Sequence, residues 1–477
     1  MLTGSEMAVV DANAAALGVP RKQLMESSGH ALARAVRAHA DPDDAVAVVA
    51  GRGNNGGDAL VAARFLEAYD QRVLLLGRPE TITTDIAREN WTALQAAGIP
   101  TEQIRDSTQF ALGDPDLVVD AMLGTGISGA LREPVATAAR AMNDSDATVL
   151  SVDVPSGLDA EEGTLADAAV DPDHVVSFHD TKPGLDTLDA SVTVADIGIP
   201  DAAERFVGRG DLLRLDRDPA SHKGDNGEVL VVGGGPYTGA PALSARAALR
   251  AGADLVRVAA PGSIAREIQG YSENLIVREY EGDRLGPDHT HWLDTLAADH
   301  DTLVVGPGLG DANGTLAAVE TLLSGFDGTA VVDADALSVV PGLATDADLL
   351  CTPHQGELRG MGGSTSDDWR ERADLVERFA ADIGHTLLVK GPDDIVSDGD
   401  RTRISHTGNA AMTVGGTGDV LAGVTAGLAC VLTPHDAAAI AAYATGAAGD
   451  VAAEERGGGL VATDLLEAVP RVLWNTV

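Results

Sequence analysis

Residues 415–423 read Gly-Gly-Thr-Gly-Asp-Val-Leu-Ala-Gly, which places a glycine loop directly before an apolar run. The run over residues 420–432 is predicted to form a helix. Glycines let backbone amides converge on a ligand, and the partial positive charge of a helix N-terminus favours an anion there. Asp419 stands where the loop meets the helix. We therefore expect it either to cap the helix or to accept a proton from a ligand.

Short β-branched runs alternate with alanine-rich helical stretches along the rest of the chain. The first strand is predicted over residues 45–50, and a helix is predicted over 58–69 after the glycine loop that follows. Apolar strands of this kind, joined by helical crossovers, indicate parallel sheets covered on both faces. Further strands are predicted over residues 73–76, 117–120, 149–154, 228–232, 255–259, 303–305, 330–333, 349–352 and 386–389, with an antiparallel excursion over 395–397 and 403–405.

The length and the composition indicate that the chain has more than one domain. At 477 residues it is too long for one ordinary core, and two or three domains are expected. Prolines, glycines and mixed charges concentrate over residues 199–226, and the strand pattern restarts near His222. We place the domains at residues 1–210 and 211–477. No internal repeat is evident, so two α/β modules of different design are predicted.

The formal net charge is −40 at pH 7, and the sequence contains only four lysines. Concentrated salt tolerates such self-repulsion, because the Debye length falls to about 3 Å at 1 M. We therefore predict a halophilic protein of the cytoplasm. The chain shows no basic stripe of the kind that binds nucleic acid, so nucleic acid is not expected as a partner.

Several classes of protein are disfavoured by simple counts. Two cysteines, Cys351 and Cys430, make neither a disulfide framework nor a zinc-type cluster. The N-terminus lacks the basic start and apolar core of a signal peptide, and the longest apolar helix candidate is too short to cross a bilayer. We expect a soluble enzyme without a membrane partner, and a homo-oligomer.

Three glycine-containing loops follow predicted strands in the first domain: residues 53–58, 120–126 and 153–157. Ligands of α/β sheets bind where loops leave the carboxyl ends of strands, so these loops are expected to meet at one edge. Their amides suit phosphate, and the oxygen atoms of Asn55, Asp120 and Ser156 suit a hard cation. The alternative is that each loop is only a tight turn, with Asp58 as an N-cap.

The first domain resembles the YjeF N-terminal family of NAD(P)H-hydrate epimerases, over roughly residues 1–210. The resemblance rests on these motifs: Gly-Arg-Gly-Asn-Asn-Gly-Gly-Asp at 51–58, Val-Asp-Ala-Met-Leu-Gly-Thr-Gly at 119–126, Val-Asp-Val-Pro-Ser-Gly-Leu-Asp at 152–159, Met-Glu-Ser-Ser-Gly at 25–29 and Lys-Pro-Gly at 182–184. It implies a Rossmann-like, three-layer αβα domain.

The same resemblance implies roles for individual residues. Asn55, Asp120 and Ser156 would hold a potassium ion, and Asp153 would contact the damaged nicotinamide ring and assist its proton chemistry. The implied contacts to NADHX or NADPHX are Asn54, Asn55, Gly56, Gly57, Asp58, Gly124, Thr125, Gly126, Ile127, Ser128, Gly129, Ala130 and Asp153.

The second domain carries its own ordered motifs: residues 223–227, 233–241, 306–310, 333–337, 352–357, 390–392 and 415–419. This order resembles the YjeF C-terminal family, the ADP- or ATP-dependent NAD(P)H-hydrate dehydratases with a ribokinase-like α/β fold, from about His222 onward. The implied hydrate contacts are Ala240, Gly308, His354 and Asp419, and the implied nucleotide contacts are Lys390, Gly391, Pro392, Asp393, Asp394 and Gly418. Magnesium is expected on the nucleotide phosphates, and ADP is favoured as the donor.

The chemistry of a dehydratase agrees with these residues. Phosphorylation turns the ring hydroxyl of the hydrate into a good leaving group, and phosphoryl transfer needs positioning, charge stabilisation and a base. The amides of residues 415–418 can hold the phosphoryl group, and Asp419 can accept the hydroxyl proton. His354 can instead be a polar turn residue and Glu357 a cap. Asp333 and Asp335 can bond to backbone at a strand end, or support the residues that contact the ligands without contacting them directly.

Three of the four lysines, Lys182, Lys223 and Lys390, lie inside motif segments, and we expect them beside anionic ligands. The expected enzyme is bifunctional: one domain interconverts R and S forms of NADHX and NADPHX, and the other dehydrates the S form with ADP, giving NAD(P)H, AMP and phosphate. One alternative is a ribokinase-like kinase for a vitamin precursor or a small alcohol. Another is that the first domain is a non-catalytic binding module, against which its retained polar residues argue.

Overall fold

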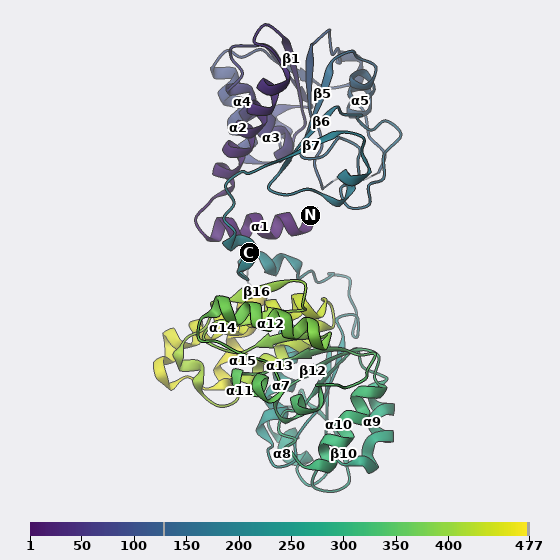
Figure 1. Cartoon of the computed structure of the whole chain (residues 1–477), viewed down its shortest axis with the longest axis vertical. Helices are drawn as coiled ribbons and strands as arrows, with labels where there is room; N and C mark the ends of the chain where they lie inside the picture. The colour runs from purple at the N-terminus through teal and green to yellow at the C-terminus, as the bar shows by residue number, and fades with distance from the viewer. Residues whose placement is uncertain (127–128, 475–477) are drawn as a thin grey trace. The chain divides into compact units, whose positions relative to one another are not determined.

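The computed structural model describes residues 1–126 and 129–474 of the chain. It divides into two compact units, Met1–Ala203 and Glu204–Val477, which run from purple to teal and from teal to yellow in Figure 1. Each unit is an α/β domain around a predominantly parallel sheet, which confirms the predicted fold class. Among the described residues, none of the helices has the length and apolarity required to cross a bilayer.

The sheet of the first unit has seven parallel strands in the order β3-β2-β1-β4-β5-β6-β7. The strand order reverses between β1 and β4, so the loops that follow these two strands leave the sheet at a topological switch point. The strands are β1 (Ala45–Ala50), β2 (Asp70–Leu76), β3 (Thr101–Ile104), β4 (Leu117–Ala121), β5 (Thr148–Val152), β6 (His174–Phe178) and β7 (Ser191–Ala195).

Helices cover both faces of this sheet, as Figure 1 shows. Val48 of β1 packs in one buried cluster with residues of α2 (Arg21–His39), α3 (Asn54–Arg64) and α4 (Asp85–Ala96). Val49, which points to the opposite face, packs in another cluster with residues of α5 (Val135–Asn143). Successive strand residues are thus buried on opposite sides, and the unit has the three predicted layers.

The sheet of the second unit has nine strands in the order β10-β9-β8-β11-β12-β13-β14-β15-β16. Pairing is parallel from β10 to β14 and antiparallel for β15 and β16, as predicted. The strands are β8 (Glu228–Val232), β9 (Leu255–Pro261), β10 (Ile276–Tyr280), β11 (Thr302–Val305), β12 (Thr329–Val332), β13 (Asp348–Cys351), β14 (Thr386–Val389), β15 (Asp394–Ser397) and β16 (Thr402–Ser405).

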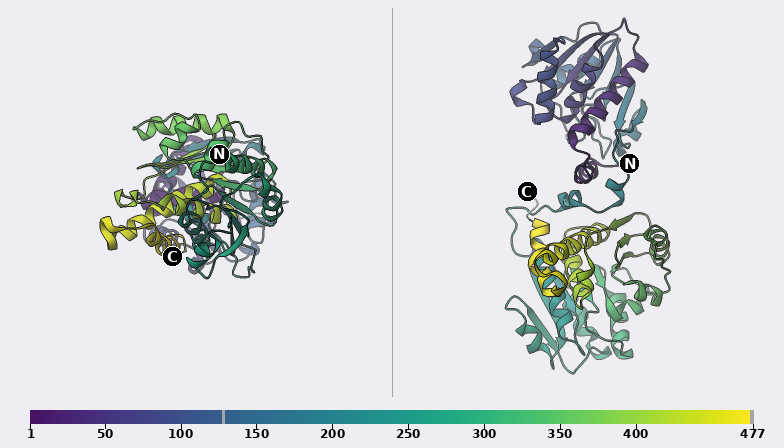
Figure 2. Two further views of the ribbon diagram at one scale, coloured as in Figure 1. Left: turned by 90° about the horizontal axis from the view of Figure 1, so that it is seen from below. Right: turned by 90° about the vertical axis from the view of Figure 1, so that its left-hand side faces the viewer.

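Two helical layers enclose this second sheet, seen from two further directions in Figure 2. One buried cluster joins the sheet to residues of α7 (Gly239–Ala251), α13 (Thr417–Ala429), α14 (Pro434–Arg456) and α15 (Ala462–Trp474). The other joins it to residues of α9 (Thr290–Ala297), α10 (Asn313–Gly325), α11 (Gln355–Gly360) and α12 (Trp369–Ile383).

Helices α13 and α7 approach each other closely because α13 carries glycine at the contact. A Cβ atom at Gly423 would lie 2.0 Å from the carbonyl oxygen of Ser244, and one at Gly427 would lie 2.7 Å from that of Ala248. The hydroxyl of Ser244 also donates a 2.8 Å hydrogen bond to the carbonyl of Asp419. Packing against α7 therefore fixes the N-terminal turn of α13.

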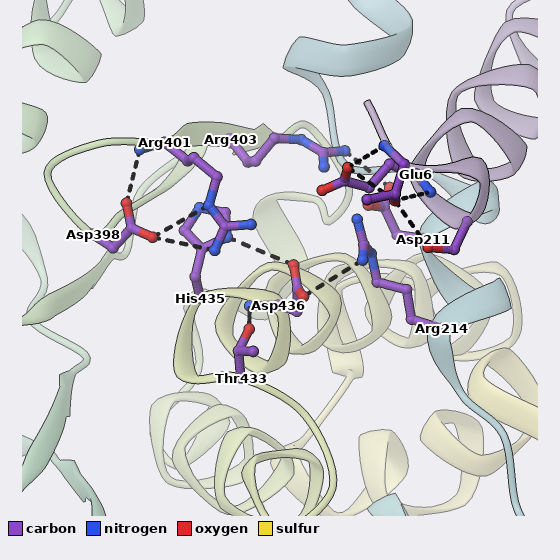
Figure 3. Close-up of polar contacts among 11 residues, drawn as sticks. Glu6, Asp211, Arg214, Asp398, Arg401, Arg403, Thr433, His435 and Asp436 are labelled. Atoms are coloured by element: carbon purple, nitrogen blue, oxygen red, sulfur yellow. Dashed lines mark hydrogen bonds and ion pairs between the residues drawn. The ribbon is translucent and has the colours of Figure 1, made fainter. Parts of the chain in front are cut away.

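The segment that begins the second unit is tied to its sheet edge. Val207 donates its amide to the carbonyl of Ile404, 2.9 Å away, so backbone groups of the edge strand β16 are covered. Arg403 of β16 pairs with Asp211 at 3.0 Å, and Arg214 lies 3.6 Å from Asp436 of α14 (Figure 3). These contacts place the start of the second unit before residue 210, where the sequence pattern had set the boundary.

Two helices start earlier than predicted. Helix α3 begins at Asn54 with Gly53 as its N-cap, so Asp58 is a buried residue inside the helix. Helix α13 begins at Thr417 with Gly416, at φ +96°, as its N-cap. The interpretation of Asp58 and Asp419 as N-caps is therefore wrong, because glycine backbones begin both helices.

Candidate active sites

The first candidate site lies at the carboxyl ends of β1, β4 and β5, where the three glycine-containing loops of the first unit meet. The side-chain Nδ2 of Asn55 donates hydrogen bonds to the backbone carbonyl of Leu123, 2.6 Å away, and to that of Val152, 3.1 Å away. Gly51 permits the close approach, because a Cβ atom there would lie 1.8 Å from the carbonyl oxygen of Met122. Residues of all three loops thus come together.

Asp120 is fully buried at the centre of this site. Its carboxylate accepts hydrogen bonds from the hydroxyl of Ser156 at 2.6 Å, the amide of Ser156 at 2.8 Å and the hydroxyl of Ser151 at 2.9 Å. Burial raises the pKa of Asp120, and these hydrogen bonds only partly oppose it. No basic side chain pairs with Asp120 within residues 1–126 and 129–474. A bound cation would therefore supply the missing counter-charge.

The oxygen atoms around Asp120 suit a hard cation such as potassium. Asn55 offers its side-chain carbonyl, and Ser156 offers a hydroxyl that also accepts the amide of Leu123 at 3.0 Å. Carboxylate, amide and hydroxyl oxygens are the ligands that hard cations prefer. The residues that the sequence nominated for potassium are thus adjacent and chemically suited to it.

Asp153 lies beside this cluster in a strained backbone conformation, with φ +63°. Its Oδ1 atom accepts hydrogen bonds from the ammonium of Lys182 at 2.5 Å and from the backbone amide of Phe178 at 3.2 Å. Lys182 is almost fully buried, and its other hydrogen bonds go to the hydroxyl of Ser177 and the carbonyls of Phe178 and Asp180. The sequence had pointed to Lys182 only as a motif residue beside an anion, and had not identified its partner.

Asp58 of helix α3 is close enough to Asp153 for their charges to interact. Burial, followed by the nearby negative charges of Asp153 and Asp11, raises the pKa of Asp58 well above its ordinary value. The neutral form of Asp58 is favoured, whereas Asp153 has Lys182 as a counter-ion. Two carboxyl groups in such different environments are suited to different steps of a proton transfer.

The other residues expected to contact the substrate lie in the first turn of α3 and in the loop after β4. Asn54, Gly56 and Gly57 belong to the first turn of α3. A Cβ atom at Gly124 would lie 3.4 Å from the Cβ of Asn55, and one at Gly4 of α1 (Gly4–Ala16) would lie 3.2 Å from the side chain of Thr125. Gly129 and Ala130 are exposed, and Ile127 and Ser128 lie outside the described residues.

The second candidate site lies at the carboxyl ends of β12, β13 and β14. The ammonium of Lys390 is 2.8 Å from Oδ1 of Asp333 and 3.9 Å from Oε2 of Glu357. A Cβ atom at Gly418 would lie 3.3 Å from the same ammonium. Four of the motif segments seen in the sequence are therefore neighbours here.

Asp419 is partly buried in the first turn of α13, beside the glycine loop. Burial, followed by the negative charge of Asp333, raises the pKa of Asp419 to about 6, while Lys390 acts in the opposite direction. A carboxylate with a pKa near the working pH can both accept and release a proton. The position and the environment of Asp419 thus suit a general base.

His354 is the N-cap of α11. Its Nδ1 atom accepts the amide of Glu357 at 2.9 Å, and the carboxylate of Glu357 accepts the amide of His354 at 2.7 Å. The capping role considered for Glu357 is confirmed, and His354 shares it. The side chain of His354 is 60% exposed, so its ring can still contact a ligand.

Ala240 follows one glycine loop and Gly308 belongs to another that adjoins it. Gly234 donates its amide to the carbonyl of Pro307 at 2.9 Å, and a Cβ atom at Gly308 would lie 3.0 Å from the carbonyl of Tyr237. Ala240 lies in the first turn of α7, one turn before the serine that bonds to Asp419.

The loop after Lys390 is held from two sides. Asp394 accepts the amide of Gly391 at 2.9 Å, and burial raises the pKa of Asp394 to about 7. Asp393 lies 2.6 Å from Nδ1 of His406, and its carbonyl accepts a hydrogen bond from the buried Arg372. An open hollow of about 650 Å³ lies next to the glycine loop of α13 and is lined by Asn409, Ala410, Ala411, Thr413, Val414, Ala453, Gly457, Gly458 and Leu460.

The sequence did not identify the side-chain partners of Asp333 in this site. Backbone bonding at a strand end was one of the two expected roles of Asp333, but the carboxylate accepts hydrogen bonds from the side chains of Lys390 and Thr352. Only the pairing of β12 with β13, and of β13 with β14, brings these side chains together. Asp335, two residues later, is exposed.

Comparison with protein families gives a match for each unit. A model described as NAD(P)H-hydrate dehydratase matches residues 229–471, and one described as YjeF-related protein N-terminus matches residues 21–184. The chain is also similar to two proteins described as bifunctional NAD(P)H-hydrate repair enzyme Nnr. The one from Methanothermobacter thermautotrophicus is 44% identical, over 98% of this chain and 94% of the relative. The one from Methanopyrus kandleri is 42% identical, over 99% of this chain and 97% of the relative.

Solved structures resemble 57% of the chain. The ADP/ATP-dependent NAD(P)H-hydrate dehydratase from Bacillus subtilis, co-crystallized with ATP and Mg²⁺, is 26% identical with a TM-score of 0.50, and 99% of it is covered. A ribokinase-like superfamily protein from Enterococcus faecalis is 22% identical with a TM-score of 0.51, and 96% of it is covered, which supports the fold alone.

Proposed function

This chain belongs to the bifunctional NAD(P)H-hydrate repair enzymes, and from that premise we propose how its residues carry out two reactions. The first unit is the epimerase domain and the second is the dehydratase domain. The epimerase interconverts the R and S forms of NADHX and NADPHX, and the dehydratase returns the S form to NADH or NADPH. Family membership favours this function over a small-molecule kinase joined to a non-catalytic module.

We propose that Asp419 is the general base of the dehydratase. Its carboxylate accepts the proton of the ring hydroxyl. The hydroxyl oxygen bonds to the terminal phosphorus of the nucleotide as the bond from that phosphorus to the bridging oxygen breaks, and the rest of the nucleotide leaves. The bond between the ring carbon and the ester oxygen then breaks, and inorganic phosphate leaves with the electron pair of that bond. A proton passes from the neighbouring ring carbon to solvent as the double bond forms. The observation that carries this proposal is the place of Asp419 in the first turn of α13, next to the glycine amides.

We propose that the nucleotide is ADP, which leaves as AMP. The ammonium of Lys390, beside Gly418, attracts the phosphates, and residues 391–394 complete their binding loop. The hollow beside Val414 offers room for the nucleoside. Ala240, Gly308 and His354 would contact the hydrate.

Magnesium on the phosphates would neutralise charge during the transfer. Within the part of the chain that the structure describes, no group of three or more His, Cys, Asp or Glu residues could hold a metal. Magnesium does not require such a group, because it often binds to substrate phosphates and few protein groups. The Bacillus subtilis dehydratase, crystallised with ATP and Mg²⁺, supports the same choice.

For the epimerase we propose that Asp153 assists the proton chemistry at the nicotinamide ring, with Lys182 as its counter-ion. The buried carboxylate of Asp120, with Asn55 and Ser156, would bind a potassium ion near the substrate. The residues at the N-terminus of α3 and in the loop after β4 would hold the nucleotide, since amides at a helix N-terminus favour phosphate.

The net charge of −40 supports the proposal that the protein works in a salt-rich cytoplasm. The same charge argues against nucleic acid, and we propose no membrane partner. We expect a homo-oligomer, which sedimentation of the pure protein tests directly.

The decisive experiment supplies purified R and S hydrates to the intact chain, with ADP or ATP, and follows the return of NAD(P)H absorbance. Recovery from S-hydrate alone demonstrates the dehydratase, and recovery from R-hydrate requires the epimerase as well. Accumulation of a stable phosphorylated product in place of free phosphate would instead establish the kinase alternative. No recovery with either nucleotide would refute the dehydratase.

A further inference from the structure

Asp333 is a buried carboxylate that accepts two side-chain hydrogen bonds on one oxygen. Its side chain is 4% exposed, and Oδ1 accepts both the ammonium of Lys390 and the hydroxyl of Thr352, each at 2.8 Å. Its backbone is packed against Gly306, where a Cβ atom would lie 1.8 Å from the carbonyl oxygen of Asp333. The carboxylate is therefore held in one place by β12, β13, β14 and the loop after β11.

This carboxylate decides where the ammonium of Lys390 lies. Lysine has a flexible four-carbon stem, so a charge at its end is localised only where a partner holds it. Burial favours the neutral amine of Lys390, but the attraction to Asp333 and their hydrogen bond outweigh it and raise the pKa of the lysine. Lys390 thus stays charged, next to Gly418.

Asp419 stands in the combined field of this pair. The charges that act on Asp419 are Asp333, which follows β12, and Lys390, which follows β14. Glu357 of α11 and His354, the N-cap of that helix, lie near Lys390. The negative charge of Asp333 raises the pKa of Asp419, and the positive charge of Lys390 lowers it. The two charges therefore act on the base in opposite directions.

We propose that Asp333 is a positioning residue for dehydration: it fixes the Lys390 ammonium beside Gly418 and acts through its charge on Asp419. The inference rests on the proposed dehydratase, with Asp419 as the base. Asp333 touches neither substrate nor nucleotide in this scheme. It sets the place of the cation that meets the phosphates and the pH at which the base becomes active.

The test is the pH profile of kcat/KM for S-hydrate, measured on the intact chain at saturating ADP. Asp333→Asn keeps the shape of the side chain and removes its charge. We expect a loss of rate of roughly 10- to 100-fold, because a misplaced cation no longer meets the phosphates well. We also expect the acid limb of the profile to move to lower pH by roughly 0.5 to 1 unit, because a like charge near Asp419 has been removed.

Matched variants separate this role from a structural one. Asp335→Asn removes a carboxylate from the same segment without touching Lys390, and it should leave the profile unchanged. Asp333→Glu keeps the charge, so the acid limb of its profile should lie close to the pH of the wild-type limb. Lys390→Met should move the limb to higher pH, which keeps the inference testable if Asp333→Asn does not fold.

Two outcomes would overturn the inference. One is an Asp333→Asn enzyme whose acid limb coincides with that of the wild type, whatever its rate. The other is a Lys390→Met enzyme whose limb stays in place or moves to lower pH. Failure of the wild type to restore NAD(P)H absorbance would refute the proposed function itself, so the two failures are distinguishable.

Discussion

The ammonium of Lys182 lies 2.5 Å from Oδ1 of Asp153, and only 1% of the lysine side chain is exposed. Ser177, Phe178 and Asp180 accept its remaining hydrogen bonds, so the buried charge is fully satisfied. Asp153 itself is 19% exposed and open to a ligand. The pair therefore combines a buried anchor with an accessible carboxylate.

Replacing Lys182 with methionine should strongly impair the epimerase, because Asp153 would lose its counter-ion. Breaking a buried pair by removing one partner typically costs about 3–5 kcal/mol, so unfolding of the first unit should begin at lower denaturant concentration. Epimerisation of R-hydrate and a denaturant melt measure the two effects. Lys22→Met is the matched control: its ion pair with Glu89 is exposed, and no change is expected. A normal epimerase rate in Lys182→Met would remove Lys182 from the mechanism.

Replacing Asp419 with asparagine should lower the dehydratase rate by about 10²- to 10⁴-fold, the usual contribution of a general base. Binding of ADP, measured by calorimetry, should change little, because Lys390 and the glycine amides remain. Asp335→Asn, on the exposed side of the same domain, should retain the full rate. Near-normal turnover of Asp419→Asn would show that another group is the base.

The dehydratase should lose activity on the acidic side of neutrality. The base works only when ionised, and the pKa of Asp419 is about 6. The value of kcat/KM should therefore rise with pH through about 6 and then level off, and it should fall below that pH as Asp419 is protonated. A profile with no acid limb between pH 5 and 7 would contradict the assignment, while Asp419→Asn should abolish the limb.

Potassium should stabilise the first unit and support its activity. The buried carboxylate of Asp120 lacks a basic partner among the described residues, so a cation on Asp120, Asn55 and Ser156 removes an unfavourable buried charge. At constant ionic strength, exchanging choline for potassium should raise the melting temperature and the epimerase rate. Asp120→Asn should weaken both responses. An equal response to choline and potassium would argue against the site.

Overall stability should increase with salt concentration. Between about 0.1 and 1 M salt the Debye length falls from about 10 to about 3 Å, which screens the repulsion of a chain of net charge −40. Thermal melts in KCl and in NaCl should both move upward over this range. The same Asp120→Asn variant should keep this response, since it is not specific to potassium. Full stability at low salt would contradict the halophilic character.

Strands at the sheet centres could be predicted well, whereas several at the edges could not. Residues of β1 and β8 are buried on both faces and form continuous apolar runs, which is the pattern that identifies such strands. Strand β6 was also not predicted, although all of its residues after His174 are buried. Strands β3, β7 and β10 were not predicted because half or more of their residues are exposed, so no buried apolar run identifies them. Their structure depends on the neighbouring strand rather than on their own pattern.

What the sequence determined by itself was local: which segments form buried strands, which glycine loops follow them, and which ordered motifs indicate the two activities. These properties follow from backbone freedom and from the periodicity of apolar residues. The tertiary structure alone decided which side chains meet. Asp153 and Lys182 are 29 residues apart, and Asp333 and Lys390 are 57 apart. Such pairs are set by strand order and packing, because a charge in a buried site takes whichever partner the fold brings within reach.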